Sequence, residues 1–272
     1  MINFNRADAF LILFLSVILL TSCEKVINLD LDSGEKKYVI EGVLTDQPGT
    51  TKVLISQTKD FDEDNNFPGV PGATVSITES GGTTTLLTPT SSGVYEAPNL
   101  VGVVGKDYTL SVSVNGSSFT AVSTMSTRVN LDSIFVTDEF LFTDTRKIVN
   151  AVYKDPPGRG DNYRFIQYVN RVKENKVLVQ NDDYTDGRMV TAKLFYFSDD
   201  EDDVGIINSG DTVRIDMLCI DPAVFRYWFS LDRSATGGSG QATPSNPVSN
   251  LQGGALGYFS AHTLQTKSMV VP

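Results

Sequence analysis

The chain has 272 residues, and its 33 acidic and 22 basic side chains give a formal net charge of −11 and a pI of about 4.5. Because nucleic-acid phosphates are bound by clustered Lys and Arg, this charge balance argues against nucleic acid as a partner. The 40% of hydrophobic residues can form a sizeable core, whereas one histidine and two cysteines leave few side chains for nucleophilic or metal chemistry.

An apolar run of twelve residues, Ala9–Leu20, lies near the N-terminus and is soon followed by Cys23. A membrane span needs about 20 residues, so this shorter run is typical of a secretory signal. The tetrapeptide LTSC that ends at Cys23 matches the bacterial lipobox, in which the cysteine is acylated and the preceding residues are removed. We therefore expect residues 1–22 to be a lipoprotein signal peptide and Cys23 to carry the lipid. An ordinary signal peptide with a chance cysteine is the alternative.

The clearest strand of the following region is Tyr108–Val114, in which apolar and polar residues alternate before Asn115-Gly116. This pair favours a type I′ hairpin turn, because both of its positions need a positive φ. Phe119–Thr124 would be the returning strand. We expect residues 38–126 to form one β-sandwich. Its succession of GVLTD, PGATVSI, SGVYEAPNL and GKDYTLSVSVNG resembles small sandwiches of the immunoglobulin-like or transthyretin-like type.

The acidic residues Asp60, Asp62 and Asp64 occupy alternate positions, a spacing with which a loop can wrap oxygen ligands around Ca²⁺. The loop lacks the glycine and the final glutamate of an EF-hand, so a solvated loop is the favoured alternative, and no other cofactor is expected. The acidic run at residues 199–203 is predicted to repel and to solubilise. Residues 182–187 predict a turn in which glycine supplies the positive φ.

Residues 127–272 contain a second set of strand signals and one helix, and we expect them to form a larger β-sandwich. Residues 23–37 would be a tether. The predicted fold class is thus all-β, with two β-sandwich domains after the signal peptide. The strands predicted in the second domain are Ile148–Tyr153, Tyr163–Val172, Val177–Gln180, Val190–Phe197, Val213–Ile220 and Tyr258–Leu264.

The helix of this domain is predicted for residues 222–234. Asp221 is a favourable N-cap residue, and Pro222 suits the first helical position. An apolar stripe follows, so we expect the helix to be a lid on the core of the second sandwich. The stripe consists of Phe225, Trp228, Phe229 and Leu231.

The segment 235–257 is rich in Gly, Ser, Asn and Pro and is longer than an ordinary connection, which favours a functional role. Aromatic side chains beside it could stack on a ligand or a partner. Burial in the core is the alternative, and for Trp228 it is the favoured one. The predicted contact residues are Trp228, Asn246, Asn250, Tyr258 and Phe259.

The single histidine, His262, lies two residues after Ser260, so a Ser-His-Asp arrangement is one alternative, although the nucleophile elbow of such hydrolases is lacking. Cys219 lies at an apolar position of an alternating strand, which predicts a buried thiol. The tripeptide RGD at residues 159–161 is known from cell adhesion, but the surrounding Pro and Gly favour a role in loop geometry. The sequence therefore favours a protein that is not an enzyme.

Several longer segments resemble one family. They are EKVINLDL directly after Cys23, YVIEGVLTDQPGTTKVLISQT, DPPGRGDNYRF, IDPAVFRYWFSL and NPVSNLQGGALGYFSA. Together they resemble the outer-membrane lipoproteins of Bacteroidota grouped as domain-of-unknown-function family 4249, over nearly all of residues 23–272. The resemblance implies association with a TonB-dependent transporter and supplies no catalytic residues. Two tripeptides, at residues 132–134 and 211–213, also resemble the O-glycosylation signal of exported Bacteroidota proteins, with Ser133 and Thr212 as acceptors.

These features predict a protein that lipid anchors to the outer membrane, on its periplasmic or its cell-surface face. We expect a non-enzymatic binding or accessory subunit that associates with a TonB-dependent transporter in nutrient uptake. A surface adhesion or glycan-binding lipoprotein that acts alone is the alternative from another class, and a hydrolase is the third.

Overall fold

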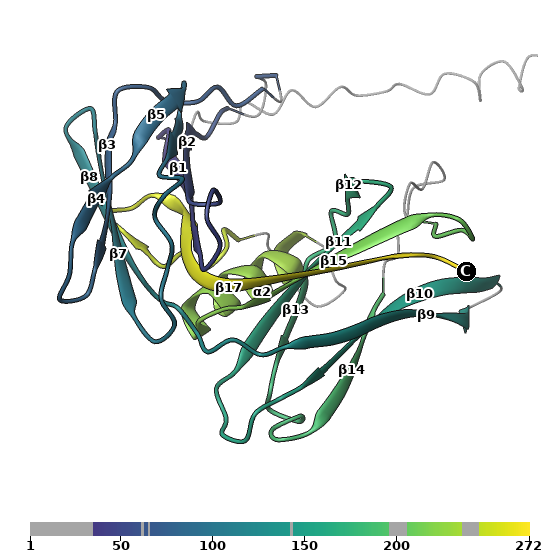
Figure 1. The fold of residues 1–272 in the computed structure, drawn as a ribbon. Helices are drawn as coiled ribbons and strands as arrows, with labels where there is room; N and C mark the ends of the chain where they lie inside the picture. Colours follow the sequence, from purple (N-terminus) through teal and green to yellow (C-terminus); the bar gives the residue numbers. More distant parts are fainter. Residues whose placement is uncertain (1–34, 61–62, 65, 142–143, 196–205, 236–244) are drawn as a thin grey trace, which may run out of the picture. The chain divides into compact units, whose positions relative to one another are not determined.

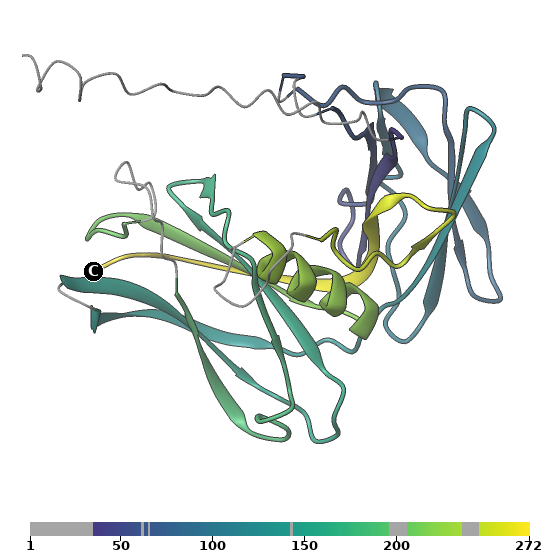
Figure 2. The same ribbon diagram turned by 180° about the vertical axis from the view of Figure 1, so that it is seen from behind.

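The structure is a computed structural model, and most of its elements are β-strands (Figure 1; Figure 2). The helix found among the described residues is α2 (Pro222–Ala235). The predicted all-β fold class is confirmed. Lys36–Pro272 form one compact unit. The described residues are 35–60, 63–64, 66–141, 144–195, 206–235 and 245–272.

The strands of this part are β1 (Tyr38–Thr45), β2 (Lys52–Gln57), β3 (Thr74–Glu79), β4 (Thr84–Leu86), β5 (Thr88–Ser91), β6 (Val94–Glu96), β7 (Asp107–Val114), β8 (Ser117–Thr124), β9 (Leu131–Leu141), β10 (Asp144–Lys154), β11 (Asn162–Val169), β12 (Val172–Lys173), β13 (Leu178–Asn181), β14 (Met189–Leu194), β15 (Thr212–Cys219), β16 (Leu251–Gln252) and β17 (Leu256–Val270).

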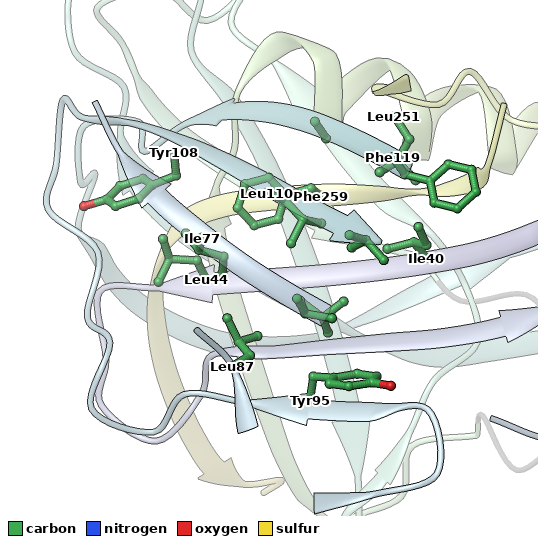
Figure 3. Packing of buried hydrophobic residues seen from close by; sticks show 14 of the residues in the cluster. Ile40, Leu44, Ile77, Leu87, Tyr95, Tyr108, Leu110, Phe119, Leu251 and Phe259 are labelled. Atoms are coloured by element: carbon green, nitrogen blue, oxygen red, sulfur yellow. The ribbon is translucent and has the colours of Figure 1, made fainter. Parts of the chain in front are cut away.

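The first sandwich packs one end of a nine-stranded sheet, in the order β17-β1-β2-β6-β5, against a sheet in the order β16-β8-β7-β3-β4. Alternate side chains of these strands point into one core, because successive residues of a strand face opposite ways. Ile40, Leu110 and Phe259 lie in this core and are fully buried (Figure 3).

The hairpin predicted from Asn115-Gly116 is confirmed. β7 and β8 pair in antiparallel register, and Val114 lies opposite Ser117. Asn115 has a φ of 48° and Gly116 a φ of 80°, the positive values that a two-residue hairpin of this type requires.

The second sandwich packs the sheet β14-β10-β9 against the other end of the nine-stranded sheet, in the order β12-β11-β15-β17, with β13 also paired to β11. Its core contains alternate residues of the paired strands, among them Val149, Ala151, Phe165 and Met217. The alternating pattern that predicted an inward-facing Cys219 on β15 is therefore confirmed.

The helix begins where the sequence predicts, and Asp221 is its N-cap. The Oδ1 of Asp221 accepts hydrogen bonds from the backbone N–H groups of Ala223 (2.8 Å) and Val224 (2.9 Å). The helix ends at Ala235, one residue later than predicted.

The helix caps the second sandwich, as predicted, and it does so from outside one of the sheets. Trp228 and Tyr227 pack against Leu218 and Tyr258, in a cluster separate from the one that contains Met217. Leu218 and Met217 are neighbours on β15, so they face opposite ways. The helix therefore covers the outer face of the β11-β15-β17 sheet, and β15 is buried on both faces.

β17, yellow in Figure 1, belongs to both sandwiches. Residues 256–262 pair in parallel with β1, and residues 263–270 pair antiparallel with β15. The predicted closing strand, Tyr258–Leu264, is the middle of this longer strand. Residues from the predicted second domain complete the first core: Leu251, Ala255, Phe259 and Ala261. The first core therefore contains residues from both sides of the boundary predicted after residue 126.

A buried group of polar side chains joins the helix to the first sandwich. The Oδ2 of Asp221 accepts hydrogen bonds from the Ser123 hydroxyl and from the backbone N–H of Thr124 (3.2 Å). The Ser123 Oγ in turn accepts a hydrogen bond from the backbone N–H of Ala261 (2.8 Å). Asp221 and Ser123 are buried, so each needs these partners.

Gly257 tests the parallel pairing of β17 with β1. It has a φ of 98°, and an added Cβ would lie 2.1 Å from the backbone oxygen of Ile40. We expect Gly257→Ala to lower the free energy of unfolding by more than about 3 kcal/mol, because strain and a backbone clash combine. The measurement is urea denaturation followed by circular dichroism.

Gly254→Ala is the matched control, because Gly254 has a φ of 87° but open space around an added Cβ. It should lose only about 1–2 kcal/mol, the cost of the backbone conformation. Equal losses for the two variants would contradict the close approach of β17 to β1.

Candidate functional site

The proposed lipid attachment site, Cys23, lies outside the described residues. Among the residues that the structure describes, none of the helices has the length and apolarity needed to cross a bilayer. Acylation of Cys23 stays a prediction.

Two of the three carboxylates proposed for Ca²⁺ are described, and lysines lie beside them. Asp64 Oδ1 lies 2.5 Å from Lys59 Nζ, and Asp60 Oδ2 lies 3.9 Å from Lys36 Nζ. The hydrogen bond from Lys59, with one from the backbone of Asn66, holds the pKa of the Asp64 carboxyl below its usual range. A cation would have to compete with these ammonium groups.

Asp62 lies outside the described residues, as does the acidic run at residues 199–203. In the described ranges, no group of three or more His, Cys, Asp or Glu side chains is arranged to hold a metal ion. The Ca²⁺ site stays a prediction.

The turn predicted at residues 182–187 is confirmed, with a φ of 72° at Gly187. It lies against the loop that contains RGD, because Asp182 Oδ2 accepts the backbone N–H of Gly160 (2.8 Å) and Asp186 Oδ1 accepts that of Gly158 (2.7 Å). Gly160 and Gly158 have φ values of 122° and 118°. Loop geometry thus accounts for the glycine of the RGD tripeptide.

The two loops bring four carboxylates together: those of Asp155, Asp161, Asp182 and Asp186. Burial, followed by the negative charges of the other three, raises the pKa of Asp161 to about 6. Asp155 is fully buried but has partners, since it accepts hydrogen bonds from the Tyr163 hydroxyl and from the backbone N–H of Gly187 (3.2 Å). At neutral pH the repulsion between Asp161 and the other carboxylates therefore lowers stability at this end of the second sandwich.

Of the five residues predicted as a contact surface, Trp228 of α2 and Tyr258 of β17 pack on each other between the helix and the sheet. Their ring centroids are 5.0 Å apart, and the guanidinium carbon of Arg164 lies 3.3 Å from the centroid of the Trp228 ring. Trp228 and Tyr258 are only 8% and 7% exposed. Trp228 is thus core, the favoured alternative, and Arg164 stabilises it by a cation–π contact.

The other three residues are not gathered at one surface. Phe259 is fully buried in the first core, so it cannot stack on a ligand. Asn250 is bound to the backbone of Phe259: its Oδ1 accepts the N–H (3.0 Å) and its Nδ2 donates to the carbonyl oxygen (2.8 Å). Asn246 is exposed. The role of Asn250 is therefore to hold the segment before β17 onto the strand.

The Ser260 and His262 side chains do meet, since Ser260 Oγ lies 2.8 Å from His262 Nδ1. Both residues are buried, at 2% and 4% exposure, so a substrate cannot reach the hydroxyl. Burial, and then the positive charge of Arg164, lowers the pKa of His262 to about 3, which keeps the ring neutral. This pair is a satisfied core contact.

The predicted burial of Cys219 is confirmed, and the thiol has no disulfide partner in the described part of the chain. Burial raises the pKa of Cys219, and its Sγ accepts a hydrogen bond from the backbone N–H of Val129 (3.4 Å). The predicted glycosylation sites, Ser133 on β9 and Thr212 on β15, are both exposed. Their modification stays a prediction.

A cavity of about 490 Å³ between the sheets of the second sandwich is a site that the motifs did not indicate. Gln167 of β11, Leu194 of β14, Ile207, and Asp138 and Lys147 of β9 and β10 are among the residues that line it. Its volume lies in the range typical of small-molecule sites.

One signal for this cavity was present in the sequence. The inward face of β11 reads Tyr163, Phe165, Gln167, Val169, in which a single amide interrupts an apolar series. This signal is weak on its own, because a buried glutamine is usually satisfied by a neighbouring polar group.

Comparison with known proteins gave one family. The family model described as Domain of unknown function (DUF4249) matches residues 24–268. Among solved structures, a two fibronectin type-III domain segment from chicken tenascin matches with a TM-score of 0.22 and 10% identity, over 70% of this chain and 91% of that chain. No curated protein matches the chain.

The raised pKa of Asp161 gives the first prediction from these sites. A carboxyl whose pKa is higher in the folded state stabilises the fold below pH 4 and loses that contribution as the pH rises toward 6. Asp161→Asn should therefore raise the free energy of unfolding at pH 7, by less than about 1 kcal/mol because solvent screens the charges. At pH 3.5 the gain should vanish.

Thermal unfolding of both proteins at the two pH values measures this difference. Asp132→Asn, which removes an exposed carboxylate of β9, is the control and should show no such pH dependence. A gain at pH 7 that persists at pH 3.5 would exclude the electrostatic explanation.

The second prediction concerns Asn250. Asn250→Ala should lower the free energy of unfolding by about 2–3 kcal/mol, because the N–H and the carbonyl group of Phe259 both lose a partner. Asn250→Asp should lose as much, since one carboxylate oxygen would face the Phe259 carbonyl oxygen. Chemical denaturation is the measurement, and the exposed Asn246→Ala is the matched control, with an effect within about 0.5 kcal/mol. A structural role for Asn250 is disproved if the two alanine variants are equally stable.

Proposed function

The chain belongs to the family described as Domain of unknown function (DUF4249), and we propose that it is a lipid-anchored, non-enzymatic binding or accessory subunit of the outer membrane. We further propose that it associates with a TonB-dependent transporter in nutrient uptake. The single observation that supports the location most strongly is the LTSC tetrapeptide at the end of the apolar run Ala9–Leu20. The family match begins at residue 24, directly after the cysteine of this tetrapeptide.

A binding role is supported by the chemistry of the described side chains. The Ser260–His262 pair and the Cys219 thiol are the nucleophile candidates raised by the sequence, and all three residues are buried. Because a catalytic nucleophile must touch its substrate, these groups favour a structural role over hydrolysis. The second sandwich, in contrast, has a polar cavity of the size of a small-molecule site.

The partner is proposed from the resemblance of the quoted segments to outer-membrane lipoproteins that accompany TonB-dependent transporters. A net charge of −11 is consistent with this setting, because it keeps an exported domain soluble and away from nucleic acid.

Anchoring is tested with the two cysteines of the chain, each changed singly. Cys23→Ser should move the protein from the membrane fraction to the soluble fraction, since the acyl chains are lost. Cys219→Ala, at the buried thiol, should leave the protein in the membrane fraction and is the matched control. Immunoblots of separated membranes measure both, and retention of Cys23→Ser in the membrane would contradict lipid anchoring.

The partner is tested by purification of the tagged wild-type chain from outer membranes solubilised in mild detergent. We expect a TonB-dependent transporter to accompany it in roughly stoichiometric amount, identified by mass spectrometry. Cys219→Ala should bring down the same partner. Purification of the chain alone would exclude a stable transporter complex and favour a lipoprotein that acts by itself.

A further inference from the structure

The cavity of the second sandwich is lined by side chains that face inward. Val149 and Ala151 of β10 point into the core, so Lys147, two residues away from Val149, lies on the same face of the strand. Asp138 of β9 lies directly opposite Lys147 in the register. Three strands therefore direct polar groups toward one space: β9, β10 and, through Gln167, β11.

The side-chain oxygen of Gln167 is buried and unpaired within the described ranges. It is only 2% exposed, and its Oε1 has no hydrogen-bond partner among the described residues. A buried amide oxygen without a donor costs about 1–3 kcal/mol of stability. Because the residue lines the cavity, a ligand could reach this oxygen if the amide, which is closed to solvent in the free protein, turned toward the cavity. A hydrogen bond donated by the ligand would then remove this cost.

The charges that line the cavity balance. Lys147 and Asp138 form an ion pair of 3.1 Å, and Arg146 and Asp144 add one further charge of each sign. A ligand with a net charge would meet no excess of the opposite sign. The lining therefore fits a neutral ligand that offers donors and acceptors to an ammonium group, a carboxylate and an amide.

Apolar surface lies beside these polar groups. Leu194 and Ile207 line the wall, and Phe140, 74% exposed, lies opposite the lining residue Thr145 on the neighbouring strand. An exposed aromatic ring on the strand next to a lining residue can pack on the C–H face of a polyhydroxylated ring. Ligands that combine such a face with several hydroxyl groups match both halves of the lining.

We propose that this cavity is a binding site for a small neutral polyol of the size of a monosaccharide or disaccharide. Its hydroxyl groups can donate to the Oε1 of Gln167 and accept from Lys147, which a purely donating or purely accepting ligand cannot do. The proposal rests on the proposed binding role and specifies its ligand class.

The experiment uses the full chain in a detergent without a sugar headgroup. Saturation-transfer NMR and calorimetry measure binding of glucose, galactose, N-acetylglucosamine and maltose, with glucuronate and glucosamine as charged counterparts. We expect at least one neutral sugar to bind, and more tightly than its charged counterpart. Absence of binding by every neutral sugar, or stronger binding of a charged one, overturns the proposal.

Gln167→Leu tests the site itself. It should weaken binding of the neutral sugar by about tenfold or more, because the buried hydrogen bond is lost. Its melting temperature should equal or exceed that of the wild type, since an unsatisfied amide is replaced by an apolar group of similar size. The matched control is Gln252→Leu, the same change at an exposed position of β16 in the first sandwich, which should bind normally. Unchanged binding by a folded Gln167→Leu protein would overturn the assignment of the site.

These outcomes separate the cavity from the transporter. Sugar binding without a co-purified transporter supports the polyol site and contradicts the proposed partner. A co-purified transporter without sugar binding overturns the polyol site and leaves the accessory role in place.

Discussion

β17 pairs in parallel with β1 over residues 256–262 and antiparallel with β15 over residues 263–270, so two hydrophobic cores share one strand. Parallel neighbours need a long connection. Here the connection from β1 to β17 contains all the other strands and the helix that the structure describes. The first sandwich cannot be completed until the C-terminal residues are present, because Phe259 and Ala261 lie in its core. Stability is therefore coupled across the chain. Loss of the C-terminal strand would remove strand pairing from both sandwiches at once.

Several polar side chains bind β17 and its neighbours through hydrogen bonds to the backbone or to one another. Asn250 binds the backbone of Phe259 on one side, and Ser123 accepts the N–H of Ala261 while it donates to Asp221. One carboxylate thus serves as helix N-cap and as a link between the helix and the first sandwich. Buried polar groups of this kind are costly unless every member is satisfied. Their dense pairing explains why the asparagine and aromatic residues near this strand act in the structure rather than at its surface.

The features predicted correctly from the sequence are those that depend on residues close together in the chain. The Asn115-Gly116 turn, the cap at Asp221 and the inward faces of β7 and β15 follow from φ preference, side-chain capping and two-residue periodicity. The partners of a strand do not follow from such rules, because parallel pairing depends on contacts about 200 residues apart in the sequence. The helix was predicted correctly as a cap of the second sandwich, but its apolar stripe does not specify which sheet surface it covers. Likewise, the sequence around Asn250 and Phe259 does not distinguish a side chain that binds the protein's backbone or lies in its core from one that binds a ligand.

Gln167 and Asn250 illustrate how satisfaction of hydrogen bonds separates structural polar residues from functional ones. Both are amides with a large apolar neighbour: Gln167 lies in β11, and Asn250 directly precedes Leu251 of β16. The amide of Asn250 uses its oxygen and its nitrogen on a neighbouring backbone, so removing it should only destabilise. The Oε1 of Gln167 lies buried without a partner, which lowers stability in the free protein. A group that lowers the stability of the free state stabilises a complex when its partner arrives. This difference, invisible in residue type, is what makes the cavity a place where a ligand has something to gain.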